Sequence, residues 1–257
     1  MIRFNKIIFI ILAFILAFSS LVYAKADSWY CKRTQDHSQP AIPEEFRYIE
    51  QYNGYYADRN HSNMVDNDKV VYLTFDAGYE NGNISKTLDV LQKNNVCGSF
   101  FILSNLVDTS PDLVKRMSSE GHLVCNHTSK HPDVTRFTTI DEFKGELDAL
   151  NKICYDRCGI KVSNYFRPPE GKFNEQTLNF ANELGYKTIF WSFAYADWDN
   201  NNQPSKEYAK EKILSNLHNG AIILLHPTSK TNVDILDEVI KEIKAQGFRF
   251  ASLDELC

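Results

Sequence analysis

Charged and polar side chains follow several apolar segments of this sequence, at the points where those segments end. Asp76 comes directly after the apolar run 70–75, Asn126 and His127 follow 123–125, and His226 follows 221–225. A carboxylate at the border of a core must gain hydrogen bonds, a cation or a metal, because otherwise it neutralises. Imidazoles and carboxylates gathered in one place could exchange protons with a substrate and hold a metal ion.

His127 and His131 are the candidate metal ligands. Two imidazoles four residues apart can point to the same side of a helical turn, and neutral imidazole is a preferred ligand of zinc. Pro132 argues against a regular helix here and predicts a shaped loop. Catalytic zinc usually has three protein ligands, so a carboxylate should complete the set. The position where we expect that carboxylate, beside Asp76, is Ala77.

The segment Arg167-Pro168-Pro169-Glu170-Gly171 predicts a stiff turn. Arg167 can donate a fork of hydrogen bonds to a carboxylate. The backbone N–H groups of Glu170 and Gly171 are expected to be free to point at an anion. The alternative is that the two prolines only make a rigid connection.

A second carboxylate and imidazole lie farther along the chain. Asp197 precedes the large apolar side chain of Trp198, and Leu224 lies in the buried run that ends at His226. A carboxylate commonly orients an imidazole, sets its tautomer and raises its basicity. Taken alone, His226 could equally be a packed core histidine.

Short apolar runs alternate with amphipathic stretches from residue 69 onward, which predicts parallel strands joined by helices. We expect strands at 70–75, 99–103, 123–125, 188–193, 221–225 and 248–251, and a weak strand that ends near Phe166. We expect helices at 84–93, 111–119, 140–155, 175–184, 205–217 and 233–246. The carboxyl ends of parallel strands lie on one face, so the polar residues above should converge there. With about seven strands, the choice is between a barrel and an open doubly wound sheet.

Two kinds of enzyme receive little support. No G-x-G-x-x-G sequence follows the first strand, which weakens a nucleotide-binding interpretation. The serines are not set in a G-x-S-x-G turn, which weakens that of a serine hydrolase.

The chain has 257 residues, 43% of them hydrophobic, which suits one sizeable domain. Residues 1–24 combine two cations with a long apolar stretch and predict a secretory signal cut after Ala24, or alternatively an uncleaved membrane anchor. Loss of that segment would change the net charge from −5 to −7 (26 cations minus 33 acids), so nucleic acid is not an expected partner. Contact with a membrane is expected only through this segment. Residues 25–68 have no sustained period and predict an extension wrapped on the domain.

Export would allow the six cysteines to form disulfides. Cys97 and Cys125 lie in apolar runs and are interpreted as small core residues. Cys154 and Cys158 could form a local disulfide or bind a metal, and a bridge between Cys31 and Cys257 is a guess from their places near the two ends.

Five segments, taken together and in order, resemble the motifs of the polysaccharide deacetylase family, which is carbohydrate esterase family 4 or the NodB homology domain. They are Thr74-Phe75-Asp76-Ala77-Gly78, His127-Thr-Ser-Lys-His131-Pro132, Arg167-Pro-Pro-Glu-Gly171, Asp197-Trp198 and Leu224-Leu225-His226. The resemblance covers residues 69–253. Within the family, segments 78–82 and 191–198 look most like the branch that acts on N-acetylmuramic acid in spore cortex peptidoglycan.

This resemblance implies an α/β fold, a distorted (β/α) barrel of about seven strands, and an exported hydrolase that removes acetyl groups from glycan strands at the cell wall or spore cortex. By resemblance, Asp76 is the base that deprotonates water, Arg167 holds Asp76 ionised, and the Glu170 N–H stabilises the oxyanion. In the same way, His226, held by Asp197, is the acid that protonates the leaving amine, while Trp198 and Leu224 form the wall around the acetyl methyl.

The family also implies a divalent cation, with zinc as the first candidate, bound by His127 and His131. Most members have a second aspartate where this chain has Ala77, and a methyl group cannot coordinate a metal. We therefore expect a weakly bound, readily chelated ion. The alternatives to a muramic acid deacetylase are a deacetylase for N-acetylglucosamine in peptidoglycan or chitin, and a wall-binding protein that has lost its chemistry.

Overall fold

The computed structural model of the chain describes residues 25–34, 36–63 and 67–256. The expected signal or anchor, residues 1–24, and Cys257 lie outside the described residues. None of the helices in the three described ranges combines the length and the apolar character that a membrane crossing requires.

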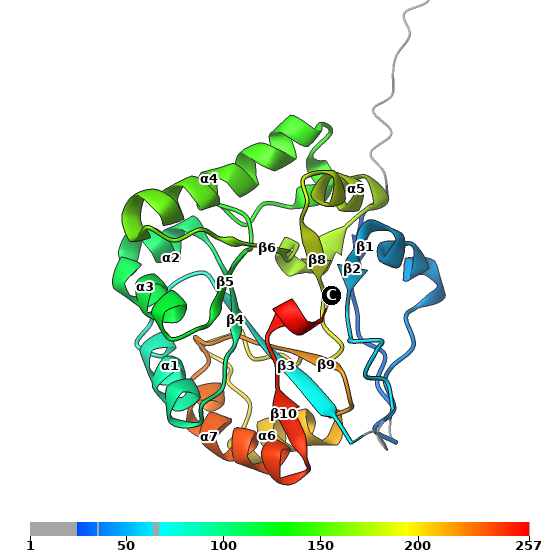
Figure 1. Cartoon of the computed structure of the whole chain (residues 1–257), viewed down its shortest axis with the longest axis vertical. Helices are drawn as coiled ribbons and strands as arrows, with labels where there is room; N and C mark the ends of the chain where they lie inside the picture. Colours follow the sequence, from blue (N-terminus) through cyan, green and yellow to red (C-terminus); the bar gives the residue numbers. More distant parts are fainter. Residues whose placement is uncertain (1–24, 35, 64–66, 257) are drawn as a thin grey trace, which may run out of the picture.

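Within those ranges, eight strands form one sheet in which every pair is parallel. The strands are β2 (Gly54–Tyr55), β3 (Lys69–Ala77), β4 (Ser99–Ile102), β5 (Leu123–Asn126), β6 (Ser163–Phe166), β8 (Lys187–Ile189), β9 (Ala221–Leu225) and β10 (Phe248–Phe250). Their order is β10-β3-β4-β5-β6-β8-β2, and β9 also pairs with β3. The strands curl around a common centre and the helices lie outside them (Figure 1).

The sheet closes on itself just after β8. The expected strand 188–193 is split: β8 ends at Ile189, and Phe193 then forms an isolated parallel bridge with Ile223 of β9. The Leu224 N–H donates to the carbonyl of Phe193 at 2.9 Å. Closure by a few hydrogen bonds explains why the fold is a distorted barrel and not an open sheet.

Helices follow most of the strands, as predicted. They are α1 (Ile84–Lys93), α2 (Ser104–Thr109), α3 (Pro111–Ser119), α4 (Ile140–Cys158), α5 (Glu175–Glu183), α6 (Lys206–Ser215) and α7 (Lys230–Ala245). The sequence analysis missed α2, because its six residues are too few to show a helical period. It also ended α4 three residues early; the helix continues to Cys158 and stops at Gly159, whose φ of 70° is left-handed.

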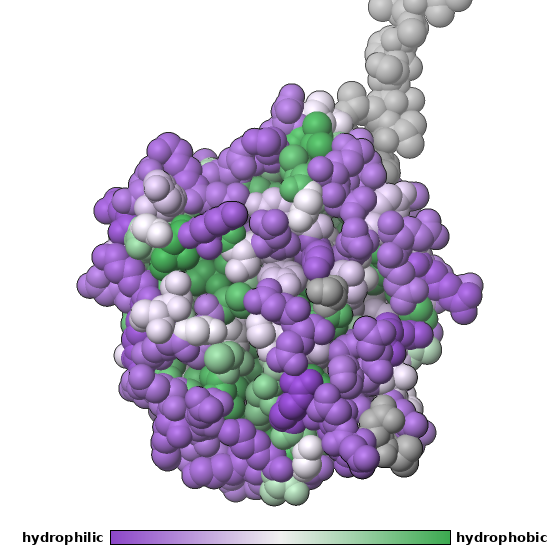
Figure 2. Space-filling model, viewed as in Figure 1, coloured by the Kyte–Doolittle hydropathy of each residue, from purple (hydrophilic) through white to green (hydrophobic). Residues whose placement is uncertain are grey.

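The core lies between the sheet and these helices. All five residues of β9 are buried, and the rings of Phe75 and Phe100 stack with centroids 4.8 Å apart on neighbouring strands. The outer surface in Figure 2 is mainly hydrophilic, with apolar residues confined to small areas. Burial on both sheet faces fixes where each strand ends, and hence where the polar residues that follow it emerge.

The extension at 25–68 is more regular than expected. Strand β1 (Asp27–Ser28) pairs antiparallel with β7 (Lys172–Phe173), and β2 adds an edge strand to the main sheet. The Trp29 ring packs 4.8 Å from that of Phe190, and its indole N–H donates to the carbonyl of Trp191 at 2.8 Å. Strands of two residues leave no alternation in a sequence, which is why none was predicted here.

Among the described residues, the cysteines 31, 97, 125, 154 and 158 form no disulfide with one another. The guessed bridge between Cys31 and Cys257 lies outside the described residues, because Cys257 does. Cys125 and Cys154 are buried, but Cys97 is exposed, so its interpretation as a core residue is wrong. It follows α1 in the connection to β4, at the border of the apolar run and not inside it. The local disulfide between Cys154 and Cys158 is absent among the described residues.

Candidate functional site

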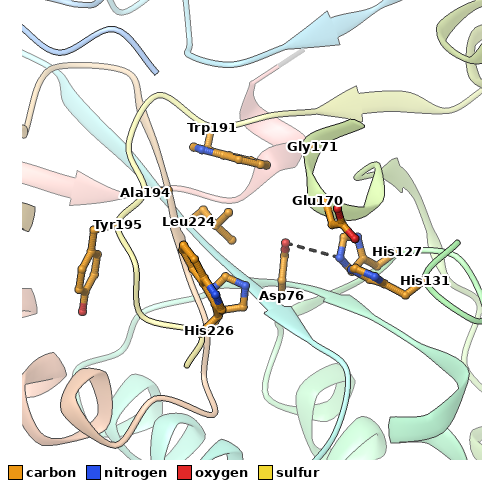
Figure 3. Close-up of a pocket in the computed structure, with 11 residues that line it drawn as sticks. Asp76, His127, His131, Glu170, Gly171, Trp191, Ala194, Tyr195, Leu224 and His226 are labelled. Carbon is orange, nitrogen blue, oxygen red and sulfur yellow. Dashed lines mark ion pairs between the residues drawn. The ribbon is translucent and has the colours of Figure 1, made fainter. Parts of the chain in front are cut away.

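The carboxyl ends of the strands surround a pocket of about 610 Å³. It is lined by Asp76, His127, His131, Glu170, Gly171, Trp191, Ala194, Tyr195, Trp198, Leu224 and His226 (Figure 3). Seven of the predicted site residues are therefore in the lining. The other two, Arg167 and Asp197, lie buried directly behind it.

Asp76 points into the pocket from the end of β3, and the buried side chain of Arg167 lies behind it and binds its carboxylate. The Arg167 Nη1 donates to Asp76 Oδ1 at 2.7 Å. The Asp76 side chain is 11% exposed, whereas that of Arg167 is fully buried. Burial alone would raise the pKa of Asp76, but the charge and hydrogen bond of Arg167, together with the nearby His127 and His226, outweigh burial and the pKa is lowered. Asp76 is thus an ionised carboxylate at the pocket floor.

The guanidinium of Arg167 is fixed on all sides. Its Nε donates to the Ile189 carbonyl at 3.0 Å, and its Nη2 donates to Thr74 Oγ1 at 2.9 Å. The ring of Phe101 lies 4.1 Å from Cζ. A buried arginine whose donors are all oriented keeps the carboxylate in one position.

His127 presents a free nitrogen toward Asp76. Its Nδ1 lies 2.8 Å from the Arg167 carbonyl oxygen, which can only accept, so Nδ1 carries the proton. Burial lowers the pKa of His127 to about 4, so the imidazole is neutral and Nε2 has a lone pair. Nε2 lies 3.6 Å from Asp76 Oδ2 (dashed line, Figure 3).

His131 lies beside His127, with ring centroids 5.0 Å apart. The two are not on a helical turn, because Thr128 and His131 have left-handed φ values of 71° and 60°. The loop is held by Glu146 of α4, whose Oε2 accepts from the N–H groups of Ser129 and Lys130 at 3.1 Å each. Sequence reasoning missed Glu146, because a glutamate within a helix carries no motif.

The donor chemistry at this place fits a cation bound by two imidazoles. Among the described residues, no group of three or more His, Cys, Asp or Glu side chains is arranged around a common metal position. Ala77 is fully buried in the apolar core and is absent from the pocket lining. Ala77 therefore offers no side-chain ligand to an ion at this place.

The turn after β6 has one free donor and not two. The Gly171 N–H donates to the Pro168 carbonyl at 3.0 Å, so the expectation that it is free is wrong. Within the described chain, no acceptor is hydrogen-bonded to the Glu170 N–H. The left-handed φ of Glu170, 56°, accounts for this difference between the two N–H groups, because it turns the peptide group at Glu170 away from the direction that a helix would give it. The Glu170 carboxylate pairs with Lys172 at 2.7 Å.

His226 faces Asp76 across the pocket (Figure 3). Asp197 is hydrogen-bonded to His226 from behind the pocket lining. Asp197 Oδ1 accepts from His226 Nδ1 at 2.6 Å, and Oδ2 accepts from the His226 backbone N–H at 2.8 Å. Burial lowers the pKa of His226, but the hydrogen bond and the charge of Asp197 outweigh burial, and the pKa is raised. Asn232 of α7 also donates to Asp197 Oδ2, at 2.6 Å, and was missed because its place in the helix is unremarkable.

Aromatic and aliphatic side chains complete the pocket. Trp198 lies beside His226, with ring centroids 6.2 Å apart, and Leu224 is buried at the pocket floor. Trp191 and Tyr195 were not predicted as site residues. Tyr195 hydrogen-bonds Asn232, which links this wall to the partner of Asp197. The result is a pocket with an ionised carboxylate and a basic imidazole on opposite sides.

The chain is similar to known proteins along most of its length. The family model described as Polysaccharide deacetylase matches residues 63–189. "Peptidoglycan-N-acetylmuramic acid deacetylase PdaA" of Bacillus subtilis is 42% identical over 230 residues, which is 89% of this chain and 85% of that protein. The structure of B. subtilis PdaA, described as a family 4 carbohydrate esterase, superposes with a TM-score of 0.83 over 90% of this chain and 97% of the other, also at 42% identity.

Two further relatives have other descriptions. "Peptidoglycan-N-acetylglucosamine deacetylase PgdA" of Listeria monocytogenes is 35% identical over 189 residues, which is 74% of this chain and 39% of that protein. A Bacillus anthracis protein, BA3943, described as a carbohydrate esterase family 4 pseudoenzyme, superposes with a TM-score of 0.69 at 26% identity, covering 79% of this chain and 68% of the other.

Proposed function

The chain belongs to the polysaccharide deacetylase family, as a hydrolase of the amide of an N-acetyl sugar, and we propose that its substrate is N-acetylmuramic acid in peptidoglycan. The single observation that supports this substrate most is the 42% identity to PdaA, which extends over 89% of the chain. That coverage is wider than the 74% matched by the N-acetylglucosamine deacetylase PgdA.

In this proposal Asp76 is the general base. An ionised carboxylate that lies at the pocket floor can take a proton from water as the water attacks the acetyl carbon. Arg167 keeps the carboxylate ionised before the reaction and fixes its direction. The buried ion pair at 2.7 Å supports both roles.

His226 is the general acid on the other side of the bond. An amine is a poor leaving group and must receive a proton as the C–N bond breaks. With Nδ1 held by Asp197, the Nε2–H of the imidazolium is the proton that faces the substrate. The raised pKa of His226 favours the protonated form that carries this proton.

The oxyanion would be stabilised by the free N–H of Glu170. His127 and His131 would hold a divalent cation, for which zinc is the first candidate, and when bound this ion would polarise the acetyl carbonyl and acidify a water. Trp198 and Leu224 would enclose the acetyl methyl. With two neutral ligands and the methyl of Ala77 in place of a carboxylate, the affinity for the ion would be low.

The product would be a muramic acid with a free amine, whose attack on its own lactyl carboxyl would close a δ-lactam with loss of water. We propose that the protein is exported by residues 1–24 and acts at the cell wall or spore cortex. Residues 69–253 would form the deacetylase domain and residues 25–68 its extension.

Mass spectrometry of muropeptides and peptide-free glycan after incubation with the protein tests the substrate. Loss of one acetyl group, and then of one water, from muramic acid alone supports the proposal. Loss of acetyl from glucosamine alone contradicts it and supports the second candidate, which the 35% identity to PgdA favours.

The third candidate is an inactive wall-binding protein. The similarity of the chain to the pseudoenzyme BA3943 is the observation in its favour. Both ion pairs at the pocket are intact in this chain, which argues for chemistry. An Asp76→Asn protein that releases acetate as fast as the unmodified protein would remove the catalytic assignment.

A further inference from the structure

A second hollow adjoins the catalytic pocket and shares the side chain of Trp198 with it. It has a volume of about 330 Å³ and is lined by Ala196, Trp198, Asp199, Asn202, Pro204 and Tyr208. We propose that this hollow is a sugar-binding subsite that holds a neighbouring unit of the glycan strand while the reacting unit occupies the catalytic pocket. This inference rests on the proposed function.

The aromatic side chains are the first reason. Trp198 is 60% exposed and Tyr208 is 48% exposed, although large aromatic side chains are ordinarily well buried. Both line the same hollow, and Pro204 adds a third apolar side chain to its lining. Exposed apolar groups that gather in one hollow mark a place where a ligand binds. The C–H faces of a pyranose ring are flat and apolar, so they pack well on such rings.

The polar side chains are the second reason. The Asp199 Oδ1 accepts from the backbone N–H of Asn201 at 2.9 Å, which fixes the position of the carboxylate. Asp199 forms no ion pair, and the Asn202 amide no side-chain hydrogen bond, with any other described residue. Both remain available to the hydroxyl and acetamide groups of a sugar, which need donors and acceptors at the edges of the ring.

Continuity with the catalytic pocket identifies the occupant. Trp198 lines both the catalytic pocket and this hollow. On the side of Tyr79 the catalytic pocket continues, since Asp76, His131 and His226 line that part as well. Asn200 donates to the Tyr79 hydroxyl at 2.5 Å, which ties the loop that carries Trp198 to the loop after β3. A hollow that shares one wall with the catalytic pocket suits the unit next to the reacting one in a linear polymer.

Charge narrows the occupant further. Asp199 is the charged residue in the lining, so a sugar that carries a carboxylate would be repelled there. The strand of peptidoglycan alternates an amino sugar with a lactyl carboxylate and one without. We therefore assign the hollow to the neutral amino sugar next to the reacting unit.

The experiment compares kcat and KM on peptide-free glycan of two lengths, a disaccharide and an octasaccharide. In the unmodified protein we expect a lower KM for the octasaccharide. Tyr208→Ala should reduce this preference about two- to tenfold through KM, with little change in kcat for the long glycan. Tyr208→Phe keeps the ring and should keep the preference.

Tyr155→Ala is the matched control, because Tyr155 is an exposed tyrosine of α4 that lies outside these hollows. A Tyr208→Ala protein that keeps the full preference for the octasaccharide overturns the subsite, as does an equal loss on both lengths. The proposed function survives either result as long as muramic acid is deacetylated. If no deacetylation occurs at all, the proposed function fails, and calorimetric binding of the octasaccharide to the same variants still decides the subsite.

Discussion

Two ion pairs face each other across the pocket, and they differ in which member, the carboxylate or the cation, faces the pocket. In one, the carboxylate of Asp76 is partly exposed and the cation, Arg167, is fully buried behind it. In the other, the imidazole of His226 is 25% exposed and the carboxylate of Asp197 is buried. Each buried member is also hydrogen-bonded to the surrounding chain. Arg167 donates to it and Asp197 accepts from it, and these bonds fix the positions of both side chains.

The comparison shows that the same kind of pair can supply a base or an acid. The buried member holds the exposed member in its charged form, against the effect of desolvation, which favours the neutral form of both. Whichever member faces the pocket determines which way a proton can travel. Each variant below removes one member, which tests whether the two pairs act in these opposite senses.

The largest effect is expected from Arg167→Met, which removes the buried cation. Asp76 would then be desolvated without a partner, so its pKa would rise and the base would be lost. We expect deacetylation to fall by about 10²- to 10⁴-fold, and the free energy of unfolding in urea to fall by about 3–5 kcal/mol.

Arg249→Met is the control for Arg167, since Arg249 pairs with two carboxylates at an exposed position. It should change the free energy of unfolding by less than about 1 kcal/mol. An Arg167→Met protein that is as active and as stable as this control would show that the pair has no catalytic or structural importance.

His226→Gln should lower the rate with peptidoglycan glycan by about 10²- to 10⁴-fold, because the leaving amine loses its proton donor. An aryl acetate has a leaving group that needs no proton, so its hydrolysis should fall much less. The ratio of the two rates is the measurement.

His61→Gln provides the comparison for His226. His61 also lies 2.7 Å from an aspartate, Asp58, but outside the catalytic pocket. That variant should leave the ratio unchanged. Equal losses on both substrates in His226→Gln would contradict the role of acid.

His131→Ala tests the two-imidazole metal site. Removal of one of two ligands should raise the zinc concentration needed for half-maximal activity by at least about tenfold, measured by titrating chelated protein with zinc. Full activity of the unmodified protein after exhaustive chelation would reject the metal altogether.

The smallest effect is expected on the pH dependence of kcat/KM in Asp197→Asn. The hydrogen bond and charge of Asp197 raise the pKa of His226, so their loss lowers it. An acid is active below its pKa, and the alkaline limb of the profile should therefore move to lower pH in the variant. A limb that stays in place would mean that another group donates the proton.

Much of this site could be predicted because its residues directly follow buried strands. The burial of 70–75 and 221–225 in the barrel determines where Asp76 and His226 emerge, and an apolar run is visible in a sequence. The barrel of about seven strands was confirmed for the same reason.

Residues that act from a distance could not be predicted. Glu146 and Asn232 lie on helices that pack behind the pocket, and only the folded chain brings them to the loop of His131 and to Asp197. The state of the Gly171 N–H depended on one left-handed residue, Glu170, and no preference of glutamate indicates that conformation. Local backbone geometry of this kind is set by tertiary packing.

If the leader stays uncleaved, the short strand β1 would limit how far from the membrane the domain can reach. Asp27 is already paired with β7, and Trp29 donates its backbone N–H to the carbonyl of Gly171, in the turn that lines the pocket. Three residues of extended chain cover roughly 10 Å. An uncleaved leader ending at Ala24 would therefore keep the barrel against the bilayer, where it meets only glycan at the membrane surface. Cleavage would allow the same pocket to diffuse through the full thickness of the wall.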